Sequence, residues 1–135
     1  MAQREASHEI SVDESIGVIV VAYGRSSTVE SICASIDEVA AIALETGIRR
    51  LIADFRLEPV MKSELDQISM VTHLVSAMPR SSRIATVFRD QSQLDKVRIS
   101  ELAAQNRRLH LKAVTTMDAA MAWVTHLSAT PGSAE

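Results

Sequence analysis

The sequence is poor in the residues that build exposed binding surfaces. It has one cysteine and 3% aromatic residues, and its formal net charge is −3. Nucleic-acid binding needs positive charge to neutralise phosphates and aromatic side chains on which bases can stack, so this composition excludes nucleic-acid partners. The lone cysteine, Cys33, cannot form a disulfide within the chain, and the apolar pattern around it predicts a buried thiol of low reactivity.

Phosphate-binding and metal-binding motifs are missing as well. With four glycines, the chain contains neither G-x-G-x-x-G nor G-x-x-x-x-G-K-[ST], which excludes dinucleotide and P-loop chemistry. A metal site needs ligands at short helical or turn spacing, and the four histidines stand on separate predicted elements. They are His8, His73, His110 and His126. We therefore predict no metal, no cofactor and no catalytic residue.

Long hydrophobic runs are also missing. The longest, Ile16 to Tyr23, is far below the ~20 residues that span a bilayer. The polar start, Met1 to Glu5, lacks the apolar stretch of a signal peptide. We expect a cytoplasmic protein without integral membrane association.

What the sequence does contain is 47% hydrophobic residues, arranged in alternating strand and helix patterns. His8 to Val12 and the β-branched run Ile16 to Tyr23 predict a hairpin. Three further runs of strand length are separated by segments with helical spacing, namely Leu51 to Phe55, Ile84 to Phe88 and Leu109 to Val114. The resulting order, ββαβαβαβα, predicts a single α/β domain over residues 1–128, with a five-stranded, mostly parallel mixed sheet, four helices and a flexible tail at 129–135.

Each predicted helix begins at a hydroxyl residue that is followed three positions later by an acidic residue, the spacing of a capping box. The four pairs are Ser27 and Glu30, Ser63 and Asp66, Ser92 and Asp95, and Thr115 and Asp118. Gly47 is predicted to end the first helix and Pro79 the second, and the third is expected over Leu94 to Asn106. The helical spacing places Leu44 of the first helix and Leu65 of the second on the buried faces.

Charged residues divide between the two rims of the predicted sheet. Arginines lie just after helices and just before strands, and parallel topology gathers them on one rim. They are Arg49, Arg50, Arg80, Arg83, Arg107 and Arg108. They could offset the partial negative charge at helix C-termini, or they could dock an acidic protein surface or anionic headgroups. The sequence does not separate these two interpretations.

The carboxyl ends of the parallel strands form the opposite rim, where open α/β sheets bind their ligands. The candidate ligand-binding or partner-binding residues on this rim are Tyr23, Arg25, Asp54, Arg56, Arg89 and Asp90. Helix N-termini leave unpaired amides here, which suits a small or anionic ligand. In the alternative interpretation, Arg56 pairs with Asp54 and Arg89 pairs with Asp90, and the rim is ordinary surface.

Three segments carry a resemblance to a known family. They are the strand end Leu51 to Arg56, the strand Arg83 to Phe88, and the closing segment Met117 to Val124, which is similar to a terminal D-x-A-x-A-W-L pattern. Together with the element order, they resemble the SpoIIAA-like branch of the STAS domains, which includes anti-sigma-factor antagonists and a divergent STAS/SEC14-like group. The resemblance covers about His8 to Leu127, and it implies that Ala120 and a largely buried Trp123 pack the closing helix on the sheet.

Antagonists of this family carry D-S-S-G-L, whose second serine is phosphorylated by a kinase partner. The corresponding stretch is Met61 to Leu65, in which only Ser63 and Leu65 match. Glu64 replaces the glycine, and a carboxylate beside the hydroxyl repels an incoming phosphate. Ser63 is therefore predicted first as a helix N-cap and only weakly as a phosphorylation site.

The resemblance and the missing catalytic motifs favour a non-enzymatic regulatory or protein-interaction module. The alternative is a carrier or sensor of a small molecule or lipid, as the SEC14-like group implies. Five methionines could line an adaptable apolar pocket for such a ligand, or could belong to the ordinary core. They are Met61, Met70, Met78, Met117 and Met121. The expected partner is a protein or a small apolar or anionic ligand, and self-association into a homodimer stays open.

Overall fold

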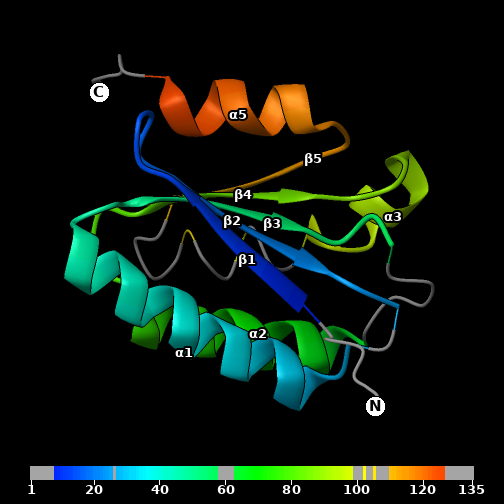
Figure 1. Ribbon diagram of the computed structural model, residues 1–135. Helices are drawn as coiled ribbons and strands as arrows, with labels where there is room; N and C mark the ends of the chain where they lie inside the picture. Colours follow the sequence, from blue (N-terminus) through cyan, green and yellow to red (C-terminus); the bar gives the residue numbers. More distant parts are fainter. Residues whose placement is uncertain are drawn as a thin grey trace, which may run out of the picture.

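The computed structural model is an α/β domain with a mixed sheet between helices (Figure 1). It describes residues 8–25, 27–57, 63–98, 102, 105 and 110–126. The elements are β1 (His8–Asp13), β2 (Val18–Tyr23), α1 (Val29–Thr46), β3 (Arg50–Asp54), α2 (Glu64–Ala77), β4 (Arg83–Val87), α3 (Gln91–Asp95), β5 (His110–Val114) and α5 (Met117–Thr125). The predicted fold class and element order are confirmed. The expected tail at 129–135 lies outside the described residues, as does much of the expected third helix.

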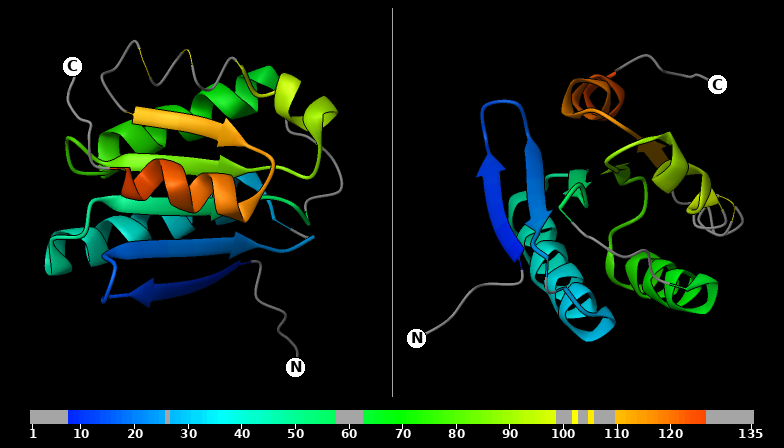
Figure 2. Two further views of the ribbon diagram at one scale, coloured as in Figure 1. Left: turned by 90° about the horizontal axis from the view of Figure 1, so that it is seen from above. Right: turned by 90° about the vertical axis from the view of Figure 1, so that its right-hand side faces the viewer.

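The five strands lie side by side in the order β1-β2-β3-β4-β5. The edge strand β1 is antiparallel to β2, and every other neighbouring pair is parallel, as the sequence predicts. Helices α1 and α2 cover one face of the sheet, and α5 covers β3, β4 and β5 on the other face (Figures 1 and 2). In the part of the chain that the structure describes, no helix has the length and apolar character needed to cross a membrane.

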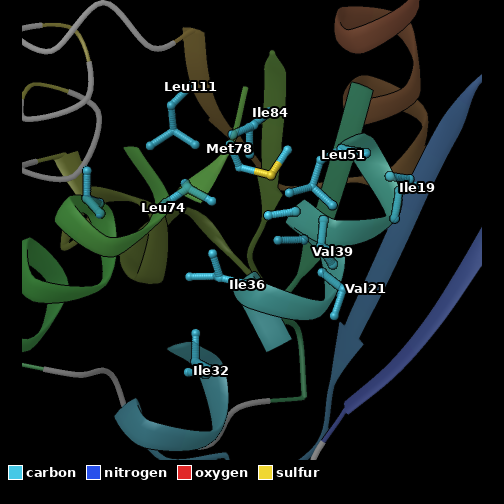
Figure 3. Close-up of a cluster of buried hydrophobic side chains, with 14 of the residues drawn as sticks. Ile19, Val21, Ile32, Ile36, Val39, Leu51, Leu74, Met78, Ile84 and Leu111 are labelled. Carbon is cyan, nitrogen blue, oxygen red and sulfur yellow. The ribbon is translucent and has the colours of Figure 1, made fainter. Parts of the chain in front are cut away.

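Strand register sorts the side chains under α1 and α2 into three rows that run across the sheet. The first row is large and aliphatic: Ile19, Leu51, Ile84 and Leu111 (Figure 3). The second row, two residues further along each strand, is Val21, Ala53, Thr86 and Ala113. The third row is aromatic: Tyr23, Phe55 and Phe88. Inward residues repeat every second position along a strand, so in-register pairing places equivalent residues side by side.

On the opposite face, α5 closes a compact core. Ala120 and Val124 of this helix are fully buried, as are the strand residues beneath them, Val18, Ile52, Ala85 and Val87. Trp123 packs against the edge of this cluster and is partly buried, less completely than Ala120 and Val124. Arg83 also contacts it: the guanidinium lies 4.0 Å from the centre of the Trp123 ring and donates to the Trp123 carbonyl oxygen at 2.8 Å.

Two helix starts agree with the sequence only approximately. Thr28, not Ser27, caps α1, because the hydroxyl of the buried Ser27 donates instead to the carbonyl oxygen of Gly24 at 3.1 Å. The capping box is completed by Ser31, whose backbone amide donates to Thr28 Oγ1 and whose hydroxyl accepts from the Thr28 amide. Similarly, Thr116 caps α5 one residue after the predicted position.

Of the other predicted helix ends, the start of α2 and the end of α1 are confirmed, and the start of α3 is wrong. Ser63 caps α2 as predicted, with its hydroxyl accepting from the Asp66 amide at 3.1 Å. Gly47 ends α1 in the left-handed region, at φ 81°, which glycine adopts at no steric cost. The cap of α3 is Asp90 rather than Ser92, so this helix begins two residues earlier than predicted.

The buried faces of α1 and α2 differ from the predicted stripes at their outer positions. Leu44 is 66% exposed and Leu65 is 80% exposed. In α2 the buried residues are Gln67, Val71 and Leu74, a stripe in which the polar Gln67 takes the inner place in the first turn. Hydrophobicity alone predicts the wrong buried face for α2, because the most buried residue of its first turn is the polar Gln67.

The contact between Arg83 and Trp123 gives a test of how α5 is held. Trp123→Ala should lower the free energy of unfolding by about 2–3 kcal/mol, less than the ~3–5 kcal/mol of a fully buried tryptophan. Arg83→Met should lower it by about 1–2 kcal/mol, because it removes the cation–π contact and a charged donor to the end of α5. Denaturant unfolding measures both, with the exposed Arg80→Met as control. Equal stabilities of Arg83→Met and Arg80→Met would contradict the proposed anchoring.

Candidate functional site

An apolar cavity of about 90 Å³ lies between the sheet and helices α1 and α2. All three rows of inward-facing strand side chains contribute to its lining. The helices contribute Ile32, Ile36 and Val39 from α1, and Gln67, Met70, Val71 and Leu74 from α2. The cavity therefore occupies the middle of the main core rather than a surface groove.

The cavity exists because the central row of the sheet is built from small residues. Ala53, Thr86 and Ala113 are paired in register on β3, β4 and β5, and all three line the cavity. The rows on either side carry leucine, isoleucine and aromatic side chains that hold the two helices away from the sheet. Protein interiors are otherwise close-packed, so three small neighbours under a fixed roof leave a hollow.

The aromatic row forms one end wall of the cavity. The Tyr23 and Phe55 ring centres are 4.6 Å apart with planes 12° from parallel, and the Phe55 and Phe88 ring centres are 5.5 Å apart with planes 8° from parallel. Tyr23 is 3% exposed and Phe88 is 5% exposed. Three of the four aromatic residues are thus gathered in one interior stack, which composition alone did not indicate.

Hydrogen bonds tie the roof of the cavity to its walls. The hydroxyl of the fully buried Ser35 on α1 donates to the Ile32 carbonyl oxygen at 2.6 Å, so the Tyr23 hydroxyl, 2.5 Å from Ser35 Oγ, is the donor between these two. Between the two roof helices, His73 Nε2 on α2 lies 2.8 Å from the Asp37 carboxylate on α1. These contacts fix both the tyrosine ring and the relative position of the helices.

Three lining residues, Phe55, Met70 and Thr86, are only partly buried, whereas the other lining residues are buried. Thr86 lies in an interior strand of the sheet between Ile84, which is 0% exposed, and Phe88, which is 5% exposed. Among the described residues that line the cavity, none carries a charged side chain, and Gln67 and Thr86 supply polar groups.

The predicted rim residues do not form one cluster. Arg56 binds Asp54 through two side-chain contacts, Nε to Oδ1 at 3.0 Å and Nη2 to Oδ2 at 2.9 Å. Arg89 lies 3.8 Å from the Asp90 carboxylate, which also caps α3. Both arginines therefore lie beside the aspartates named in the alternative interpretation, whereas its second part, that the rim is ordinary surface, stays a prediction.

Tyr23 and Arg25 stand apart from those two ion pairs. The ring of Tyr23 is buried in the aromatic row and belongs to the cavity, not to the surface of the rim. Arg25 is exposed just beyond the end of β2. Whether any rim residue contacts a ligand or partner stays a prediction, but the structure divides the set into the interior Tyr23, the exposed Arg25 and two surface pairs.

Two titratable groups have shifted pKa values. Burial raises the pKa of the Asp54 carboxyl, but the hydrogen bonds and charge of Arg56 outweigh this effect and hold the pKa below its ordinary value. Burial raises the pKa of the Cys33 thiol, and the nearby Asp37 and Glu30 raise it further. The thiol is therefore protonated at neutral pH, but Cys33 is only partly buried, so the predicted core position of its side chain is wrong.

At the opposite rim, Arg107 and Arg108 lie outside the described residues, and two of the described arginines offset helix C-termini. Arg49 Nη1 donates to the Ala43 carbonyl oxygen of α1 at 2.8 Å, and Arg83 donates to Trp123 of α5. Arg50 Nη1 donates to the Ile16 carbonyl oxygen at 3.0 Å. The helix-dipole interpretation thus holds for Arg49 and Arg83, although Arg83 serves α5 rather than the helix that precedes it in the chain.

The sequence contains a short repeat that marks the cavity. Leu51-x-Ala53-x-Phe55-Arg56 and Ile84-x-Thr86-x-Phe88-Arg89 both read as a large aliphatic residue, a small residue and phenylalanine at alternate positions. Because alternate residues of a strand share a face, the repeat predicts an aliphatic, a small and an aromatic row on one side of the sheet.

Comparisons of the chain with protein-family models, with curated proteins and with solved structures find no match. The relation to STAS domains therefore stays a prediction from the sequence. Function is inferred below from the cavity and its walls.

The ion pair of Asp54 and Arg56 predicts a pH dependence. A carboxyl whose pKa is lower in the folded chain contributes stability above its unfolded pKa and loses that contribution as the pH falls through its folded pKa. Between about pH 5 and pH 2, the melting temperature of Asp54→Asn should fall less steeply than that of the wild type. Arg56→Gln should flatten the profile in the same way. A wild-type slope in Asp54→Asn would show that the pair does not stabilise the fold.

Proposed function

We propose that this domain is a non-enzymatic module that binds a small uncharged apolar molecule, or the apolar part of a larger one, in the cavity beneath α1 and α2. One observation carries the proposal: three small residues in register, Ala53, Thr86 and Ala113, leave a hollow of about 90 Å³ in the middle of the main core. This is the small-molecule alternative that the sequence analysis left open.

The energetic cost of the hollow supports an occupant. At ~24 cal/mol per Å³, an empty cavity of this size destabilises the fold by about 2 kcal/mol, a large share of the ~5–15 kcal/mol by which domains are stable. Replacing Ala53 or Ala113 by a larger apolar residue would remove part of that cost. A ligand that fills the space recovers the lost packing contacts.

The chemistry of the lining defines the ligand. Ligand pockets are mostly apolar with a few polar groups, and here Gln67 and Thr86 supply those groups. A buried ionic group without a partner is costly, and no lysine, arginine, aspartate or glutamate is among the described lining residues. The buried part of the ligand is therefore neutral, and the lining offers contacts for binding rather than groups for proton or acyl transfer.

The five methionines do not form the pocket that the sequence analysis considered. Met70 lines the cavity, whereas Met117 and Met121 pack on the opposite face of the sheet beside α5. Met78 is buried with the main core, and Met61 lies outside the described residues. The apolar character of the site comes mainly from the strand rows and from the aliphatic residues of α1 and α2, with Met70 as its one described methionine.

A regulatory protein-interaction module is the second candidate. Two large apolar side chains are exposed at the connection from β3 to α2, Leu57 at 57% and Leu65 at 80%. Exposed large apolar side chains can contribute to partner surfaces. The exposed N-cap Ser63 lies beside Leu65, so a partner on this segment would also contact the one serine considered for phosphorylation.

The cavity-filling variants Ala53→Val and Ala113→Val test the proposal. The wild-type protein, purified from its natural host and examined by native mass spectrometry, should retain a small molecule that organic extraction releases. Each variant should retain at most a tenth as much, because the added methyl groups occupy the ligand's space. Ala122→Val, which adds the same groups on the exposed side of α5, should retain the wild-type amount.

The outcomes separate the two candidates. Retention of the molecule by Ala53→Val and Ala113→Val at the wild-type level would show that the cavity is not its site. A wild-type protein that carries no small molecule but a stoichiometric protein partner would contradict the proposal and favour the interaction module.

A further inference from the structure

We infer that Thr86 determines which molecules the cavity binds, because its hydroxyl forms a hydrogen bond with one neutral oxygen atom of the ligand. This inference rests on the proposed function and names the class of ligand, a short apolar stem that carries an alcohol or carbonyl oxygen. It follows from the position of Thr86 in the sheet, from the hydrogen bonds of the cavity lining, and from the volume of the cavity.

The uncovered surface of Thr86 belongs to the cavity. Because β4 is an interior strand, β3 and β5 cover Thr86 on both sides, and its register partners on those strands are buried. The adjacent residues Ala85 and Val87 face the other way and are buried beneath α5. On the side of α1 and α2, Ile84 and Phe88 are buried, whereas Thr86 is only partly buried and lines the cavity. The part of the Thr86 side chain that no other residue covers therefore faces the cavity.

The Thr86 hydroxyl has no hydrogen-bond partner among the described residues. The other polar side chains of the lining are already engaged, the Tyr23 hydroxyl with Ser35 Oγ at 2.5 Å and Gln67 with a partner of its own. Polar groups in protein interiors are rarely left unpaired, because a hydrogen bond that is not made there is costly. The partner of the Thr86 hydroxyl is therefore to be found in the occupant of the cavity.

Strand propensity does not account for a hydroxyl at this position. Threonine is favoured in strands because its side chain is branched at Cβ, and valine has the same branching and almost the same shape. Valine would therefore fit β4 equally well without a polar atom to bury. The register partners of Thr86 are the apolar Ala53 and Ala113, so the floor of the cavity carries its one hydroxyl at the central strand.

Water alone is a poor occupant of this cavity. A buried water molecule makes about two to four hydrogen bonds with the polar groups around it, and the described lining offers one unengaged hydroxyl among apolar side chains. A ligand with a single oxygen atom on an apolar stem needs only that hydrogen bond, and its stem gains dispersion contacts with the rest of the lining. The lining therefore suits such a ligand better than it suits water.

The volume of the cavity limits the buried part of the ligand to a few atoms. An apolar cavity of about 150 Å³ holds the six-carbon ring of benzene, so in proportion a cavity of about 90 Å³ holds about three or four non-hydrogen atoms. 2-Propanol and acetone have this size and carry one oxygen atom each. Xenon enters small apolar cavities and has no hydrogen-bonding group, so it is the matched apolar probe.

NMR titrations with these three probes test the inference, with binding followed by the amide chemical shifts of Ala53 and Ala113. Thr86→Val removes the hydroxyl at almost constant volume. It should weaken the binding of 2-propanol and acetone about three- to tenfold, as expected for the loss of one hydrogen bond, while xenon binds at least as tightly as to the wild type. Thr86→Ser keeps the hydroxyl and should keep the wild-type preference for the two oxygen compounds over xenon.

Two further variants separate the hydroxyl from the space in the cavity and from the stability of the fold. Ala113→Val fills the cavity and should weaken the binding of all three probes, whereas Thr72→Val, the same change as at Thr86 but on the exposed side of α2, should weaken none. The melting temperature of Thr86→Val without ligand should be no lower than that of Thr72→Val, because the hydroxyl that it removes has no partner in the described fold. A clearly lower value would indicate a structural role for the hydroxyl and overturn the inference.

Failure of the inference is distinct from failure of the proposed function. Equal affinities of Thr86→Val and the wild type for 2-propanol and acetone would overturn the role of Thr86, and binding of xenon would leave the apolar site in place. If none of the three probes binds to the wild type, the proposed function itself is wrong.

Discussion

The parallel pairing of β3, β4 and β5 is the constraint on which the rest of the structure depends. It brings Leu51, Ile84 and Leu111 into one row, and Ala53, Thr86 and Ala113 into the next. A shift of one residue in any strand would turn its apolar side chains to the other face of the sheet. The same register therefore determines both which residues form the core and where that core is hollow.

The two faces of the sheet use their apolar residues differently. Beneath α5, small and medium side chains such as Ala85, Val87 and Ala120 meet directly and leave the helix close to the strands. Beneath α1 and α2, the rows of large aliphatic and aromatic side chains hold the helices away from the row of small residues between them. The Tyr23–Ser35 and His73–Asp37 contacts keep those helices in place. One face thus provides rigidity, and the other provides space.

Much of the fold was readable from the sequence because it depends on local patterns. The β-branched runs, Gly47 and Ser63 were sufficient to place strands and helix ends, and short connections implied parallel neighbours. Helix starts moved by one or two residues where several hydroxyl or acidic groups compete for the same amides, as Ser27 and Thr28 do. Which of these residues caps the helix depends on which side chains are buried in the folded chain, and the local sequence does not show this.

The candidate site was much less accessible to sequence reasoning. Attention to charged residues at strand ends led to Arg56 and Arg89, which pair with their own neighbours. The cavity depends on alanine and threonine, whose contribution is the volume that they leave empty, and on Gln67, which hydrophobicity assigns to the surface. In the sequence, only the repeated pattern of large, small and aromatic residues at alternate positions indicates the cavity.

The hollow core also gives the molecule a mechanical property. A void within the folded chain disappears when the chain unfolds, so the unfolded protein and its water occupy a smaller volume, and hydrostatic pressure favours the unfolded state. In this domain the void lies under α1 and α2 and not under α5. The half of the protein that encloses it is therefore the more compressible half, and an occupant that filled the void would stiffen that half alone.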